Sequence, residues 1–104
     1  MSETNPHHRL DAIKYRLSSE VLSRFPLSVI REHARANLLR WKAQDSWGPT
    51  YEEWLAILDS NDDKLLRECM ESLDANSNRL RQSIPYVGML PQDVVLSIYA
   101  EFPR

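Results

Sequence analysis

The chain has 104 residues, of which 42% are hydrophobic and 27% are charged, the balance of an ordinary globular domain. Only 2 glycines and 1 cysteine occur. This composition excludes glycine-rich phosphate-binding loops, a disulfide within the chain and an all-cysteine metal site. It also disfavours folds built from many tight hairpins.

The N-terminal residues are polar and show no apolar periodicity. We therefore expect residues 1–9 to form a flexible tail and residues 10–104 to form a single helical domain. No secretory signal is evident, and every uninterrupted apolar run is far shorter than the roughly 20 residues of a membrane span. Together with the lone thiol, these features predict a cytoplasmic protein of bacterial type that does not enter a membrane.

Apolar residues at intervals of three and four predict two helices in the first half of the chain. The first begins near Leu10 and ends before Pro26, because the residue before a proline avoids helical geometry. The second runs from about Ser28 to Ala43, with Asn37 beside an apolar stripe formed by Ile30, Ala34, Leu38 and Trp41.

A loop over 45–50 precedes a short third helix that ends near Leu58. Thr50 and Glu53 have the spacing of a capping box, in which each side chain satisfies a backbone donor of the other. Three tryptophans, Trp41, Trp47 and Trp54, bracket this loop. They are expected to pin the second helix to the third, and Trp47 is equally suited to contact a partner.

The segment over 62–83 forms one helix or two. Apolar and small polar residues repeat along it at three and four, at Leu66, Cys69, Leu73, Asn76, Leu80 and Ile84. Four poor helix formers between Asp74 and Asn78 favour a break there. The same spacing also permits a homodimer seam.

The C-terminal part begins with an apolar, irregular connection over 84–91 that is expected to be partly buried. The following residues have strand composition, but Pro91 and Asp93 suit a first helical turn, so we predict a helix over 92–101. The fold class is therefore predicted to be all-α, a compact single domain of five or six short helices.

No constellation typical of catalysis or of a cofactor is present. Cys69 has apolar neighbours, His7 and His8 lack ligand spacing, and the acidic residues near Asp59 lack the glycine and glutamate of a calcium loop. We expect no metal, no cofactor and no enzymatic activity. The alternative is an enzyme with an unrecognised site around Arg79, Arg81, Tyr86 and either His33 or Cys69.

A protein-binding module is the leading hypothesis. Side-chain donors at a helix end lead into the apolar connection, and the charge balance of +3 over 1–45 and −5 over 46–104 is consistent with two different surfaces. The candidate partner-binding residues are Trp47, Arg79, Arg81, Gln82, Tyr86 and Met89. A nucleic-acid regulator is the alternative, with Arg31, Arg35, Lys42, Arg79 and Arg81 as contacts, but a pI of 5.9 is low for that class.

Three short motifs carry a resemblance. They are Asn37-Leu38-Leu39-Arg40-Trp41, then Glu53-Trp54, then Arg79-Leu80-Arg81-Gln82-Ser83 followed by Pro85, Tyr86, Gly88 and Leu90. Through them residues 30–100 resemble small uncharacterised bacterial helical proteins of antitoxin-like or regulatory type. The resemblance implies a non-enzymatic partner of a neighbouring gene product and assigns no site residue.

Overall fold

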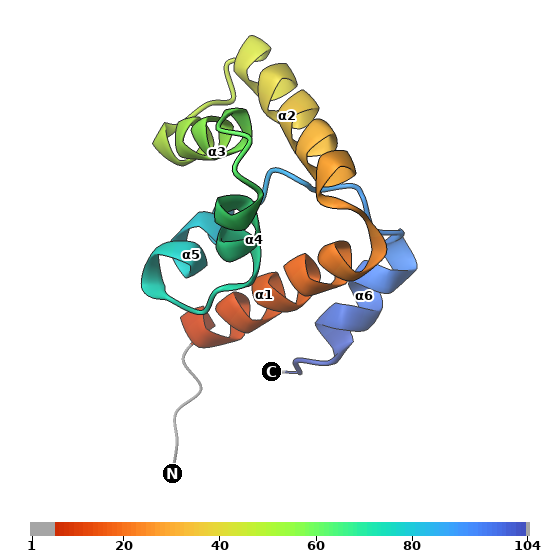
Figure 1. Cartoon of the computed structure of the whole chain (residues 1–104). Coiled ribbons are helices and arrows are strands. Elements are labelled where there is room, and N and C mark those ends of the chain that lie inside the picture. Colours follow the sequence, from red (N-terminus) through yellow and green to blue (C-terminus); the bar gives the residue numbers. More distant parts are fainter. Residues whose placement is uncertain (1–5, 104) are drawn as a thin grey trace.

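A computed structural model describes the backbone of residues 6–103 and the side chains of residues 9–103. The described residues form six α-helices and one short 3₁₀-helix, with no strand among them (Figure 1). The prediction of an all-α domain of five or six short helices is therefore confirmed.

The first two helices are α1 (Pro6–Arg24) and α2 (Leu27–Ala43), and the predicted corner at Pro26 separates them. Helix α1 begins at Pro6 rather than at Leu10, because proline is well suited to a first helical turn. The tail expected over residues 1–9 therefore overlaps this helix at residues 6–9, and its first five residues lie outside the described part.

The predicted capping box at the start of α3 (Pro49–Asp59) is wrong. Gly48 is the N-cap and Pro49 is the first helical residue, so Thr50 already lies inside the helix and makes no capping bond. A proline at this position fixes the helical backbone angle and lacks the N–H that a cap would satisfy. The Glu53 carboxylate instead accepts hydrogen bonds from the guanidinium of Arg79.

The segment over 62–83 is broken, as predicted, but the break lies at residues 72–74, and residues 75–78, where it was expected, are helical. The segment forms α4 (Asp63–Glu71), α5 (Ala75–Leu80) and the 3₁₀-helix η1 (Arg81–Ser83). Each α-helix has an aspartate cap: Asp62 accepts a bond from the Leu65 N–H at 3.1 Å, and Asp74 accepts one from the Ser77 N–H at 2.7 Å. The Asp74 cap lets α5 begin at Ala75, so the poor helix formers Asn76, Ser77 and Asn78 lie inside a helix and not in the break.

The repeat that permits a homodimer seam is used mainly inside the single chain. Its residues Leu66, Cys69, Leu80 and Ile84 are buried, whereas Leu73 is 69% exposed because the break directs it outward. The last helix, α6 (Gln92–Ala100), confirms the prediction of a helix rather than a strand near the C-terminus.

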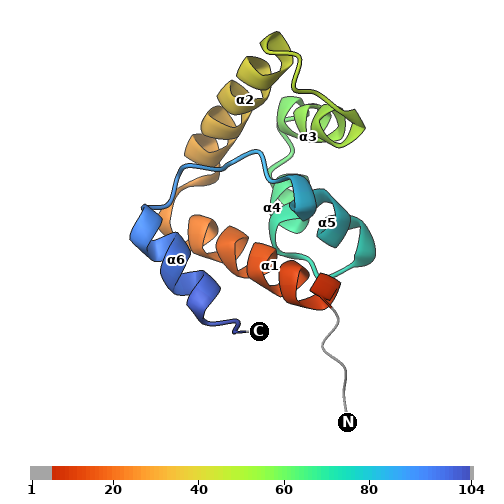
Figure 2. The same ribbon diagram turned by 180° about the vertical axis from the view of Figure 1, so that it is seen from behind.

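Helix α1 contacts α4, η1 and α6, while α2 packs against α3 (Figure 1). Seen from behind, residues 84–91 cross from η1 past the lower end of α2 to the start of α6 (Figure 2). The main core lies among these helices and is formed by Val21, Ile30, Ala34, Leu38, Trp54, Leu58, Leu66, Cys69, Met70, Leu80, Ile84 and Tyr86.

Substitutions at two adjacent leucines of α4, Leu65 and Leu66, would test this core. Leu66 is fully buried and Leu65 is 36% exposed. We expect Leu66→Ala to lower the free energy of unfolding by about 2–5 kcal/mol, because it removes buried methyl groups and leaves a cavity. The matched variant Leu65→Ala is expected to cost about 1 kcal/mol or less. Urea denaturation followed by circular dichroism measures both, and equal losses would contradict the described packing.

Candidate functional site

The connection between η1 and α6 is not helical, and its first part, residues 84–86, is buried, whereas Val87 and Gly88 are exposed. Two side chains of α2 bind its carbonyl oxygens: Asn37 Nδ2 donates to Pro85 O at 3.0 Å and to Val87 O at 3.1 Å, and His33 Nε2 lies 3.0 Å from Val87 O. Gly88 follows with a φ of +87°, a region that glycine adopts without steric cost. Two carbonyl oxygens of this segment, Pro85 O and Val87 O, thus find partners in side chains of α2.

Tyr86 fixes the same segment from the inside. Its ring packs edge-on against Trp54 of α3, with centroids 5.9 Å apart, and its hydroxyl is hydrogen-bonded to Ser18 of α1. Trp54 Nε1 in turn donates to Leu80 O at 2.8 Å. Burial raises the pKa of the Tyr86 phenol far above its ordinary value, so this group stays a neutral hydrogen-bonding partner.

This arrangement leaves a groove of about 490 Å³ that we call the α1–α6 groove. One side is formed by Lys14, Leu17 and Val21 of α1, and another by Gln92, Val95 and Tyr99 of α6. The remaining lining residues come from the connection and from the α2–α3 end, and they are Trp41, Tyr51, Gln82, Ser83, Ile84, Tyr86, Val87, Gly88 and Leu90. Its volume falls within the range of about 300–1,000 Å³ that is typical of ligand sites.

Lys14 is the one charged residue that lines this groove. Within the described part of the chain, its amine has no ion pair and donates no hydrogen bond. The nearest acid on the same helix, Asp11, accepts a bond from Gln82 Nε2 at 2.6 Å. The groove therefore combines apolar walls with one positive charge that no carboxylate of the described residues neutralises.

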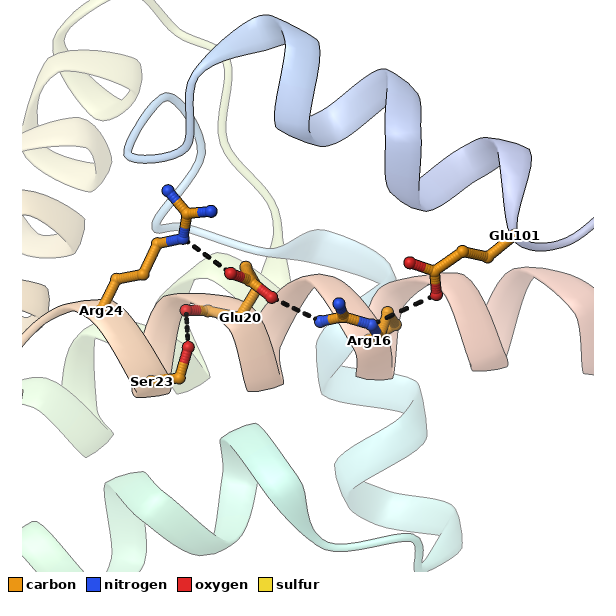
Figure 3. Close-up of polar contacts among 5 residues, drawn as sticks. All are labelled: Arg16, Glu20, Ser23, Arg24 and Glu101. Atoms are coloured by element: carbon orange, nitrogen blue, oxygen red, sulfur yellow. Dashed lines mark hydrogen bonds and ion pairs between the residues drawn. The ribbon is translucent and has the colours of Figure 1, made fainter.

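A row of charged residues on α1 reaches Glu101 at the end of α6 (Figure 3). Glu20 accepts bonds from Arg16 Nη1 at 2.7 Å and from Arg24 Nε at 2.6 Å, and Arg16 Nε reaches Glu101 at 3.3 Å. The hydrogen bond from Arg24, followed by that from Arg16, lowers the pKa of the Glu20 carboxyl. The Arg16–Glu101 contact joins α1 to the C-cap of α6, whereas the other two bonds lie within α1.

Two of the six predicted partner-binding residues, Gln82 and Tyr86, line the α1–α6 groove. Tyr86 is only 2% exposed and its hydroxyl binds Ser18, so it supports the groove from within instead of offering a free polar group. Met89 packs on the core, and Trp47 lies in the α2–α3 loop, where its indole donates to Glu52 at 2.8 Å. The structure does not bring these four residues together into one surface.

The two predicted arginines lie in opposite environments. Arg79 is exposed and forms a bidentate pair with Glu53 at 2.7 and 2.9 Å. Arg81 is fully buried: its guanidinium donates to Cys69 O at 3.0 Å and lies over the Tyr15 ring. As a correction to the expected partner site, burial removes Arg81 from any surface that a partner could touch.

The basic residues expected to contact nucleic acid do not form a free positive surface. Arg31 pairs with Asp63 at 2.7 Å and Arg35 with Asp59 at 2.8 Å. Lys42 lies 3.7 Å from Glu52, and Arg79 and Arg81 are engaged as described above. Four of the five charges are thus matched by a neighbouring carboxylate, and the fifth is buried.

Of the groups considered for catalysis, Cys69, Arg81 and Tyr86 are buried, with Arg81 bound to Cys69 O, whereas Arg79 is exposed. Desolvation raises the pKa of the Cys69 thiol, which disfavours the reactive thiolate. His33 binds the connection at Val87 O. Among the described side chains, no three His, Cys, Asp or Glu residues come together as metal ligands, and those of His7 and His8 lie outside this part.

Comparison with protein-family models, with curated proteins and with solved structures found no match to this chain. None of the described helices is both long enough and apolar enough to cross a bilayer. The chemistry of the α1–α6 groove is therefore the basis on which a function can be argued.

The ion pairs of Glu20 with Arg16 and Arg24 make the stability of the fold depend on pH. The pKa of Glu20 lies below its ordinary 4.5 in the folded protein, so its contribution to stability is present above that value and is lost as the pH falls through the lower, folded pKa. We expect Glu20→Gln to flatten the acid side of the stability curve below about pH 4.5. Urea titrations between pH 3 and 7 measure the effect.

The matched control for this experiment is Glu32→Gln. Glu32 is exposed on α2 and has no ion pair among the residues that the structure describes. This variant should retain the pH-dependence of the unmodified chain. An unchanged acid slope in Glu20→Gln would show that the charge row does not contribute to stability in the way described.

Proposed function

We propose that this chain is a non-enzymatic protein-binding module that accepts an apolar segment of a partner in the α1–α6 groove. The observation that carries the proposal is the groove itself. It encloses about 490 Å³, its walls are mostly apolar, and hydrogen bonds hold the elements that form it. Grooves of this kind bind partner segments by burying apolar side chains, and a preformed site lowers the entropic cost of binding.

The chemical content of the groove supports binding in preference to catalysis. Its lining residues include the hydroxyl of Ser83 but no carboxylate, histidine or thiol, so the bases that most often activate such a hydroxyl are not among them. Lys14 is present without a neighbouring carboxylate that would form an acid–base pair with it. This content favours recognition of a ligand over its chemical transformation.

The narrower form of the proposal is an antitoxin-like or regulatory module. It takes the product of a neighbouring gene as the partner, and its support is the sequence resemblance of residues 30–100. A cytoplasmic location and a bacterial source belong to the same proposal. The lone cysteine, which is reduced in that compartment, is the feature that supports the location.

Two adjacent residues of α6 test the site. Val95 lines the α1–α6 groove, whereas Leu96 is 60% exposed and does not. We expect Val95→Glu to weaken partner binding by about tenfold or more, because a carboxylate in the groove must be desolvated when the partner docks. Leu96→Glu introduces the same charge one residue away and should leave binding unchanged.

The measurement is affinity capture from cells that produce the chain, with both variants and the unmodified protein compared side by side. Circular dichroism first establishes that each variant is folded. The expected result is one protein recovered in stoichiometric amount by the unmodified chain and by Leu96→Glu, and lost with Val95→Glu. Recovery by Val95→Glu at full yield, or loss with Leu96→Glu alone, would show that the groove is not the binding site.

A further inference from the structure

We infer that the partner segment carries an acidic side chain that pairs with Lys14, next to the apolar side chains that fill the rest of the α1–α6 groove. This inference rests on the proposed function and adds the chemistry of the occupant to it. The feature behind it is the position of Lys14, a half-buried cation on the side of the groove formed by α1.

The charge of Lys14 is not compensated within the described part of the molecule. Seven ion pairs are formed there, and they take up the arginines Arg16, Arg24, Arg31, Arg35 and Arg79 together with Lys42. Lys14 takes part in none of them. None of the described acids near it forms an ion pair with it: Asp11 accepts a hydrogen bond from Gln82, while Asp93 and Glu101 line the opposite side of α6.

A ligand with only apolar groups would raise the free energy of the Lys14 ammonium group. A partner that covers the groove removes water from Lys14, and a buried cation without a counter-charge is costly. An acidic side chain on the partner converts that cost into a favourable contact, and it also rejects partners that carry a positive charge at the same place. The groove therefore selects a segment that is both apolar and acidic.

The spacing along α1 limits where the acid lies. Lys14, Leu17 and Val21 follow one another at three and four residues, so they share one face of the helix. Lys14 and Val21 are two turns apart, which is about 10 Å along the helix axis. The acidic group of the partner should thus lie about 5 to 10 Å from its apolar anchors, the distance of one to two turns of α1.

Selection from a displayed library of random peptides tests this chemistry. The unmodified chain, Lys14→Glu, Lys64→Glu and Val95→Glu serve as targets. Lys64 is the matched control, an exposed lysine of α4 that lies outside the groove and has no ion pair among the described residues. Circular dichroism and thermal melting establish first that each target is folded.

We expect the unmodified chain and Lys64→Glu to enrich peptides with an Asp or Glu beside apolar residues. Lys14→Glu should instead enrich peptides with Lys or Arg at that place, and Val95→Glu should lose most of the enriched sequences. A synthetic peptide from the first selection should bind Lys14→Gln about fivefold to thirtyfold more weakly than the unmodified chain. Replacing the acid of that peptide by its amide should abolish this difference.

The outcomes separate this inference from the proposed function. If peptides are enriched and Val95→Glu loses them, but Lys14→Glu selects the same acidic sequences as the unmodified chain, the pairing with Lys14 is refuted and the groove remains the binding site. If the unmodified chain enriches nothing over background, both are refuted. A dimer in analytical ultracentrifugation that Val95→Glu converts to a monomer would make a second copy the occupant and overturn the inference.

Discussion

The candidate site depends on the hydrogen bonds that hold the start of the connection, residues 85–87, against α1 and α2. This part has no helical hydrogen bonds and is buried up to Tyr86, and Asn37 binds two of its carbonyl oxygens, Pro85 O and Val87 O. The bond between Tyr86 and Ser18 then ties the same segment to α1. These contacts fix the connection that leads to α6, and α6 in turn packs directly on α1 and forms one side of the α1–α6 groove.

Much of the fold could be predicted because local signals and tertiary packing agree. Apolar residues at intervals of three and four predicted the helices, and Pro26 predicted the end of α1, whereas the poor helix formers near Asn76 lie inside α5 and not at its end. The prediction of a capping box was wrong because two signals for a helix start, Pro49 and Thr50, stand next to each other. Pro49 begins α3 one residue ahead of Thr50, and a pattern of residue types does not rank a proline against a hydroxyl. Element ends are therefore less predictable than elements.

The candidate site could be predicted only in part, because it is assembled from residues far apart in the chain. Gln82 and Tyr86 were identified from composition near a helix end, but the orientation of η1 directs the neighbouring Arg81 inward to Cys69 O. Lys14 was missed. The signal that could have found it is its place one turn from Leu17 and two turns from Val21, a cation in an apolar stripe. The sequence cannot show which such cations lack a counter-ion.

The distribution of ion pairs bears on the kind of partner. Affinity for nucleic acid comes largely from cations that release counterions from phosphates, and a cation already paired with a carboxylate contributes little to that release. Arg31, Arg35 and Arg79 are paired in this way, so the premise of a nucleic-acid surface on these residues is weak. Lys14 differs because it is half-buried beside apolar walls and has no carboxylate. A single cation in an apolar groove suits one acidic side chain of a protein far better than a row of phosphates.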